Sequence, residues 1–387
     1  MGRNANIFVV FALIAVSLKW TGADHQEYPG TETRPVLSDS EASRYTQETV
    51  FGDWGPQLIV VPDVPDYTVK VGESIQKVVN QAFLDGGVDR KFIKIEPGTY
   101  EEFVYIKGDV PLTIYGGGNS AEDVIIVQNI SASIQAEGYV NLVNPNGERY
   151  QEGDSAWDIY NGCATKSGNL GSCATVLWIE NDEFMMTLVT VQNTAVDVQG
   201  IAVQVDADKI NLMFNRYLAA QNTLYLGAHP EQRIHIHGSY VEGQTDIIVG
   251  QGAAEIHLST VKVIGNENIE HPVIFAPSTP ATQTFGFLVY NSTLTGDASY
   301  LGSNKVYLGR AWDSGIEKSD DYVPGVSPNG QLVIKASQID AITNVEQPYA
   351  PTSTSGRLFS TDLKEDRDLD DNTHNRFWEY KNYGDNA

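Results

Sequence analysis

The sequence predicts an all-β fold, a right-handed, single-stranded parallel β-helix closed at its N-terminal end by one helix. Short apolar segments recur, and each ends in a small or polar residue; these end residues are Asn193, Asn215, Gly238, Ser259, Asn291 and Ser337. The first three gaps between them are 22, 23 and 21 residues. A period in the twenties with one strand-sized unit per repeat indicates a solenoid. The Val, Ile and Thr content excludes helical repeats, and no leucine-rich frame recurs.

The two later gaps are longer, at 32 and 46 residues. The first of them fits one coil with an insertion, and the second fits either two coils or one coil with a long loop. In a parallel β-helix, equivalent residues of successive coils stack about 4.8 Å apart. Polar residues that lie about one coil apart in the sequence can therefore share one site on the outer face.

The N-terminus has the pattern of a secretory signal peptide over residues 1–23. Arg3 supplies the positive end, Ile7–Val16 is an apolar stretch too short to span a bilayer, and Thr21–Ala23 resembles a cleavage site. A buried N-terminal helix is the alternative. Because no later stretch is long and apolar enough for a transmembrane helix, we predict a secreted, extracellular protein that does not enter a membrane.

The remaining chain divides into a polar arm, 24–56, and a β-helix domain, 57–387, that includes the C-terminal tail. The arm is predicted to lie extended over a core or to be partly disordered. Apolar residues spaced on one face predict a helix over 73–86, which Gly86 ends and which would cover the open end of the solenoid.

Other segments carry weaker signals. Strands are predicted over 92–95 and 112–115, followed by long loops, above all 138–173. The aromatic segment 376–380 is expected to pack as a tail along the side of the solenoid.

The chain is strongly acidic, with 25 Lys and Arg against 50 Asp and Glu. Loss of Arg3 and Lys19 with the signal peptide leaves a net charge near −27. This balance argues against a nucleic-acid partner, because phosphate binding requires basic surface. A locally basic or aromatic groove would still allow an acidic polymer to bind.

Cys163 and Cys173 are the only cysteines, with nine residues between them in a Gly/Asn/Ser-rich segment. In a secreted chain, such a pair predicts one local disulfide rather than a catalytic thiol or a metal site. The sequons at Asn129 and Asn291 predict N-glycosylation.

Three histidines, His235, His237 and His257, alternate with apolar residues along two predicted strands. They have the composition of a metal cluster, but alternation on the flank of a solenoid explains them equally well. We predict no metal and no cofactor.

Six segments, in order along the chain, resemble motifs of the pectin methylesterase (pectinesterase) family. The resemblance extends over roughly 60–385. The segments are Pro97–Glu102, Gln199–Asp208, Gln221–Tyr225, Asp246–Gly250, Leu308–Trp312 and Arg376–Tyr380. One such match would be weak evidence for the family, whereas six matches in the family's order are strong evidence. The resemblance implies a monomeric parallel β-helix enzyme that hydrolyses the methyl esters of homogalacturonan (pectin) to carboxylate and methanol.

The resemblance also implies a role for each matching residue. Asp246 matches the nucleophile that attacks the ester carbonyl, and Arg310 matches the arginine that would hold this carboxylate ionised through a bidentate contact. Gln199 and Gln221 match the amides that stabilise the oxyanion of the tetrahedral intermediate. On their own, these glutamines would be read as a structural ladder of stacked amides.

Two aromatic residues match the substrate groove of the family. Trp312 and Tyr225 are implied to bind the sugar, since a flat apolar ring suits the face of a pyranose. The neighbouring Ala311 replaces the proline of the family pattern, which loosens a loop without touching the chemistry.

One departure concerns the chemistry directly. Asn222 stands where the family has the Asp that protonates the departing methanol and then activates the hydrolytic water. An amide does neither. The chain is therefore an active enzyme with another proton source, an esterase for a different ester with a better leaving group, or a noncatalytic carbohydrate-binding pseudoenzyme. The retained nucleophile, arginine and glutamines favour activity.

Other enzymes built on this fold fit the sequence less well. A pectate lyase needs a Ca²⁺ site of clustered acids, and a polygalacturonase needs several neighbouring Asp residues. Here Asp246 stands beside an asparagine instead.

Overall fold

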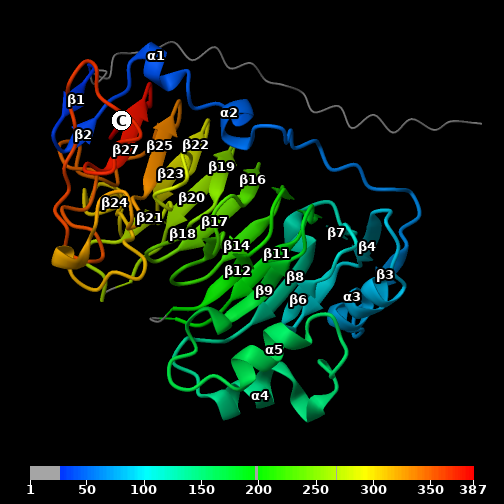
Figure 1. The fold of residues 1–387 in the computed structure, drawn as a ribbon. Coiled ribbons are helices and arrows are strands. Elements are labelled where there is room, and N and C mark those ends of the chain that lie inside the picture. The colour runs from blue at the N-terminus through cyan, green and yellow to red at the C-terminus, as the bar shows by residue number, and fades with distance from the viewer. Residues whose placement is uncertain (1–26, 197–198, 267) are drawn as a thin grey trace, which may run out of the picture.

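The computed structural model describes residues 27–196, 199–266 and 268–387. The predicted signal peptide, 1–23, therefore lies outside the described residues. Within them, three parallel sheets run the length of the molecule, and most coils contribute one strand to each sheet (Figure 1). This arrangement confirms the predicted parallel β-helix.

In the described part of the chain, the strands of each sheet follow one another in space from the C-terminal end of the solenoid to its N-terminal end. The first sheet contains β27 (Arg376–Tyr380), β25 (Gln331–Lys335), β22 (Phe287–Tyr290), β19 (Ala253–His257), β16 (Arg233–His237), β13 (Ile210–Met213), β10 (Met185–Thr187), β7 (Leu112–Gly116), β4 (Lys91–Ile95) and β3 (Tyr67–Val69). The second contains β26 (Gln338–Ile339), β23 (Thr293–Gly296), β20 (Thr260–Val263), β17 (Tyr240–Gly243), β14 (Arg216–Leu218), β11 (Thr190–Asn193), β8 (Val124–Gln128) and β5 (Gly98–Tyr100). The third contains β24 (Tyr307–Gly309), β21 (Val273–Pro277), β18 (Ile248–Gly250), β15 (Leu224–Leu226), β12 (Ile201–Val205), β9 (Thr175–Glu180) and β6 (Val104–Lys107).

The other elements are short. Strands β1 (Gly30–Thr31) and β2 (Arg34–Pro35) form a small antiparallel pair. The α-helices are α1 (Asp39–Ala42), α2 (Gln47–Phe51), α3 (Ile75–Leu84), α4 (Ala136–Val143) and α5 (Trp157–Ala164), and the 3-10 helices are η1 (Ala121–Asp123), η2 (Pro145–Gly147), η3 (Gly171–Cys173) and η4 (Ser319–Asp321). No helix in the described ranges has the length and apolar character needed to cross a bilayer.

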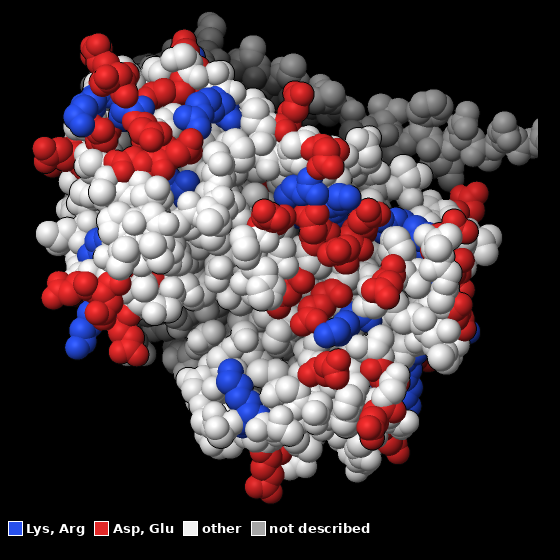
Figure 2. Space-filling view, in the orientation of Figure 1, with Lys and Arg blue, Asp and Glu red and all other residues white. Residues whose placement is uncertain are grey.

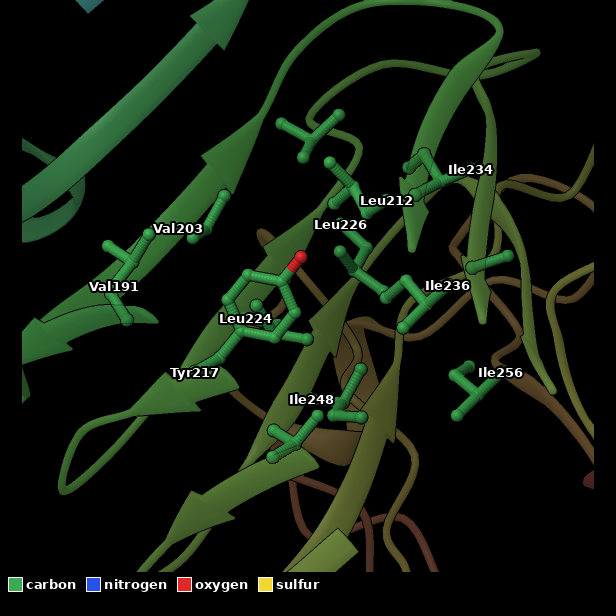
Figure 3. Packing of buried hydrophobic residues seen from close by; sticks show 14 of the residues in the cluster. Val191, Val203, Leu212, Tyr217, Leu224, Leu226, Ile234, Ile236, Ile248 and Ile256 are labelled. Carbon is green, nitrogen blue, oxygen red and sulfur yellow. The ribbon is translucent and has the colours of Figure 1, made fainter. Parts of the chain in front are cut away.

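The core lies inside the solenoid, where all three sheets turn alternate side chains inward. Figure 3 shows Leu212 and Ile236 of the first sheet, Val191 of the second and Leu224 of the third converging on one apolar interior. Each of these side chains is fully buried. Apolar burial of about 25 cal/mol per Å² makes this continuous interior the main source of stability.

A buried polar ladder closes the corner between the first and second sheets. In six successive coils, a side-chain oxygen accepts the backbone N–H of the equivalent residue in the preceding coil, at 3.1–3.2 Å. The residues that accept are Asn215, Ser239, Ser259, Ser292, Ser337 and Asn382. The ladder satisfies buried amides at a turn that no strand pairing serves.

The pairing of strands between coils corrects the first of the predicted gaps and decides between the two readings of the last one. Asn193 belongs to β11 in the second sheet, so the first predicted gap compared positions on different faces. The strand of the first sheet that precedes β13 is β10, and the series continues from β10 to β7, β4 and β3. Because β22 pairs directly with β25, the gap of 46 residues is one coil with a long loop.

The N-terminal capping helix is confirmed. Helix α3 packs against β3, β4 and β6 at the open end of the solenoid. Ser74 caps it by accepting the N–H of Lys77 at 3.2 Å, and Gly86 follows its end with φ +60°. Ile75, Val79 and Ala82 are its buried apolar residues. The helix thus shields a sheet end that would otherwise be exposed.

The predicted long loop 138–173 is wrong as a description of this segment. It contains α5 and most of α4, which build a separate lobe with its own apolar cluster (Figure 1). The predicted disulfide is present in this lobe, where Cys163 and Cys173 have Cα atoms 5.7 Å apart. The sequence prediction missed these helices because each is short and only weakly amphipathic.

The first and last described segments of the chain meet on the outer face of the first sheet. Residues 27–56 run along this face with α1 and α2, and β27 forms the last strand of the sheet (Figure 1). The expectation that 376–380 packs as a tail along the side is therefore wrong. Phe377 points into the main core, whereas Trp378 packs against the N-terminal segment.

A buried ion pair joins these two ends. Arg34 donates from Nε and Nη2 to the two carboxylate oxygens of Glu379 at 2.7 and 2.8 Å, and Arg34 is 1% exposed. The geometry is a fork-to-fork contact. It locks the N-terminal segment onto the final strand.

We expect Arg34→Ala to lower the free energy of unfolding by about 3–5 kcal/mol, because it leaves the Glu379 carboxylate buried without its partner. Urea unfolding measures this change. Arg44→Ala is the matched control, since Arg44 pairs with Asp370 at an exposed site and its loss should cost about 0–1 kcal/mol. Equal losses of stability from the two substitutions would contradict a special role for the buried Arg34–Glu379 ion pair.

Candidate active site

A pocket of about 440 Å³ opens on the outer face of the third sheet. Its walls come from successive coils, from the segment after β24 and from the lobe. The lining residues are Ser172, Gln199, Ile201, Gln221, Asn222, Tyr225, Asp246, Val249, Ala276, Arg310, Trp312 and Thr354. All seven residues that the family resemblance singled out as catalytic or substrate-binding therefore line one cavity.

The backbone register brings Asn222 and Asp246 together. Gln199 pairs with Gln221, and Gln221 pairs with Thr245, as isolated parallel bridges. Asn222 and Asp246 are the next residues in their coils, so they occupy equivalent positions, and the Asn222 N–H donates to the Asp246 carbonyl at 3.0 Å. Both adopt positive φ, 61° and 44°. Asn and Asp tolerate this left-handed conformation better than other non-glycine residues.

Asp246 is largely buried, at 7% exposure, and is fully engaged by neighbours. Nη2 of Arg310 donates to both carboxylate oxygens at 2.8 and 2.9 Å. Nε2 of Gln221 donates to Oδ2 at 3.2 Å. The predicted Asp246–Arg310 pair is present. Both of its hydrogen bonds come from one guanidinium nitrogen, whereas a bidentate fork would use two. The charge is compensated, and the Arg310 Nε is buried without a hydrogen-bond partner among the described atoms.

The segment after β24 is anchored so that Arg310 reaches the carboxylate. The N–H groups of Arg310 and Trp312 donate to the carbonyls of Phe275 and Pro277 at 2.9 and 3.0 Å, which continues the pairing of β24 with β21. Beyond it, buried Asp313 accepts from Arg357 at 3.0 Å. These contacts restrict Arg310 and Trp312 to one side of the pocket.

The apolar wall of the pocket is aromatic. Tyr225 and Trp312 have ring centroids 5.8 Å apart. Burial raises the pKa of Tyr225 to about 12, so its hydroxyl stays protonated near neutral pH. Tyr225 faces outward because it lies between Leu224 and Leu226, both of which point into the core.

Five lining residues were missed by the sequence reasoning. Ile201, Val249 and Ala276 sit in strands that read simply as apolar, although outward alternation marks Val249 as a candidate. Ser172 and Thr354 come from the lobe and from a long C-terminal connection. Their sequence context carries no signal, since only the tertiary fold brings these segments to the pocket.

The pocket contains one carboxylate. Among its twelve lining residues, Asp246 is the only Asp or Glu, and the other groups able to donate a proton from oxygen are the hydroxyls of Ser172, Tyr225 and Thr354. The side chain at the position stacked on Asp246 is the amide of Asn222. The arrangement offers a nucleophile with amide and guanidinium donors, and it lacks a paired carboxylic acid.

The glutamines do not belong to the polar ladder of the solenoid. The ladder runs along the corner between the first two sheets, whereas Gln199 and Gln221 precede strands of the third sheet and line the pocket. The two glycosylation candidates, Asn129 and Asn291, are exposed.

Comparison with known proteins identifies close relatives. The Pectinesterase family model matches residues 158–315. The chain is 42% identical to a pectinesterase of Sitophilus oryzae, over 98% of this chain and 99% of the relative. It is 35% identical to pectinesterase B of Dickeya dadantii, over 91% of this chain and 90% of that relative.

The fold is shared with a solved relative. The structure of rice weevil pectin methyl esterase superposes with a TM-score of 0.89 at 41% identity, over 94% of this chain and 100% of that one. The predicted right-handed parallel β-helix is thereby confirmed.

Proposed function

Because the chain belongs to the pectinesterase family of carboxylic ester hydrolases, we propose that it hydrolyses the methyl esters of homogalacturonan to carboxylate and methanol. The observation that carries this proposal is the buried Asp246 carboxylate, held by Arg310 in a pocket that also presents two glutamine amides. A buried carboxylate is costly unless it is paired or used, and this one opens to a cavity of substrate size.

The first step is attack by the carboxylate. An Asp246 oxygen bonds to the ester carbonyl carbon, and the carbonyl π electrons move to oxygen to give a tetrahedral oxyanion. The amides of Gln199 and Gln221 donate hydrogen bonds to that oxyanion, and each such donor is worth about 3–4 kcal/mol of barrier. Arg310 orients the carboxylate for attack and compensates the charge that remains in the site.

The second step expels the leaving group. The oxyanion collapses, the carbon–oxygen bond to the methoxy group breaks, and the methoxide oxygen takes a proton from water to leave as methanol. Asn222 donates a hydrogen bond but has no proton to give. The hydroxide left by that proton transfer attacks the acyl carbon, the bond from this carbon to the Asp246 oxygen breaks, and the Asp246 carboxylate is restored as the product acid leaves and loses its proton. Loss of general acid catalysis at Asn222 costs about 10²- to 10⁴-fold in rate, so the natural chain is a slow member of its class.

The partner we propose is methylated pectin, met outside the cell by a secreted monomer. The wall formed by Tyr225 and Trp312 suits the apolar faces of sugar rings. The N-terminal signal pattern and the disulfide support secretion. Acidic side chains spread across the face shown in Figure 2, which favours an esterified, less charged polymer over a polyanion.

Asp246→Asn should lower methanol release from highly methylated pectin by at least about 10³-fold, because the isosteric amide is not a nucleophile. Methanol is measured directly against the natural chain. Asp320→Asn, which removes an exposed carboxylate, is the control and should leave the rate unchanged. Activity that survives in Asp246→Asn would show that another group attacks the ester.

Asn222→Asp should raise turnover of methyl esters by about tenfold or more, since it restores a carboxylic acid beside the leaving group. The rate is measured across pH, where a new acid gives a new limb in the profile. An unchanged rate would mean that another group already supplies the proton. A natural preference for esters with acidic leaving alcohols, abolished by Asn222→Asp, would identify a different physiological ester.

Trp312→Ala should raise KM for pectin several-fold with a smaller change in kcat, because it removes a binding surface remote from the reacting atoms. Steady-state kinetics on pectin separate the two constants. A fall in kcat at unchanged KM would instead place Trp312 in the chemical step.

A further inference from the structure

Three histidine rings gather on the outer face of the first sheet, away from the pocket on the third sheet. His235 and His237 project from β16, and His257 lies beside His237 in the register of β19. The His237 ring centroid is 5.6 Å from that of His235 and 5.0 Å from that of His257. One nitrogen of each ring lies within 4.8 Å of the others.

The orientation of the most buried ring is determined by a chain of hydrogen bonds. Asn211 Nδ2 donates to the Gln57 carbonyl at 2.7 Å, which turns its Oδ1 toward His235 Nδ1 at 3.0 Å. An amide oxygen only accepts, so His235 Nδ1 carries the proton and Nε2 presents a lone pair. A metal-bound histidine is normally oriented in this way by a partner on its other nitrogen.

That lone pair is the unexplained feature of the cluster. His235 is 4% exposed, and its Nε2 is buried without a hydrogen-bond partner among the described atoms. Stacking on Tyr290, with ring centroids 5.1 Å apart, explains the position of the His257 ring. Stacking does not supply a hydrogen bond to the buried Nε2 of His235. A buried polar atom without a partner calls for an explanation, and a bound ion is one that suits a bare imidazole nitrogen.

We propose that His235, His237 and His257 bind one divalent transition-metal ion of the zinc class. Imidazole nitrogen suits Zn²⁺, Cu²⁺ and Ni²⁺ and not Ca²⁺ or Mg²⁺. This inference departs from the sequence prediction that the alternating histidines hold no metal.

The geometry requires a small closure. Tetrahedral zinc with bonds of about 2.0–2.1 Å places its ligand nitrogens about 3.4 Å apart, so the rings must approach by at most about 1.4 Å. His237 and His257 are only partly buried and can rotate toward His235, which Asn211 holds in place.

The carboxylate of Glu255 lies next to the three histidines and would balance the charge of a bound metal ion. Glu255 Oε2 lies 3.6 Å from His235 Nε2 and accepts from Gln47 Nε2 at 2.6 Å. It supplies the fourth ligand or holds a bound water. A cation, Lys335, also faces Glu255, but its ammonium is bound by the carbonyls of Ala42 and Tyr45.

The proposed role is structural. Gln47, which donates to Glu255, and Gln57, whose carbonyl accepts from Asn211, belong to the N-terminal segment. The Phe51 ring of the same segment packs edge-on against His235, with ring centroids 6.2 Å apart. A bound ion therefore fixes the sheet face on which this segment rests. Because the pocket is built on another sheet, esterase activity does not need the metal.

The test uses the full chain without a histidine tag, freed of metal by a chelator. Titration calorimetry with Zn²⁺ should give one site per chain, Ca²⁺ should give none, and Zn²⁺ should raise the midpoint of thermal unfolding. His257→Gln should weaken Zn²⁺ binding by at least about tenfold. His271→Gln, which removes a histidine outside the cluster, should bind as the natural chain does.

His237→Gln provides a second ligand variant if His257→Gln fails to fold, and thermal unfolding of the metal-free proteins checks both. No Zn²⁺ binding by the natural chain would overturn the proposal. Equal affinities of His257→Gln and His271→Gln would also overturn it. Methanol release measured with and without chelator is independent of both results, so failure of the metal site does not affect the proposed esterase function.

Discussion

The parallel register between successive coils is the constraint on which the rest of this structure depends. It places equivalent residues of neighbouring coils about 4.8 Å apart, so each outward position becomes one member of a column. At one corner the column is a ladder of Ser and Asn that satisfies buried amides. On the third sheet the same stacking brings Asn222 beside Asp246. On the first sheet it aligns His237 with His257. One packing rule thus generates a structural column, a reactive site and a candidate metal site.

Electrostatics separates the position of the proposed nucleophile from the merely stacked positions. Asp246 is buried, paired with Arg310 and open to a cavity, whereas the ladder side chains are neutral and closed off. In the proposed mechanism, a site with one carboxylate and three amides attacks an ester more readily than it releases an alkoxide. The chemistry that the geometry leaves weakest is therefore proton delivery to the leaving group, and this weakness follows from a single amide at Asn222.

Much of the fold and seven of the twelve pocket-lining residues could be predicted from the sequence, because they follow from periodic patterns and short motifs. The capping helix, the solenoid and seven pocket residues are examples. Short, weakly amphipathic helices such as α4 and α5 escaped detection, as did the register of the first repeat, since β10 is only three residues long. Ser172 and Thr354 reach the pocket through long connections, which no local pattern encodes. The histidine alternation was visible, but the buried lone pair of His235 is a property of the three-dimensional packing.

In the proposed mechanism, an Asp–Arg pair with amide donors hydrolyses the ester without a second carboxylic acid. Methanol release by the natural chain from highly methylated pectin, measured together with pectin binding, tests it most directly. We expect slow release above background, with one carboxylate formed for each methanol. Retained pectin binding with no methanol above background would contradict it and would identify a binding protein that has lost catalysis.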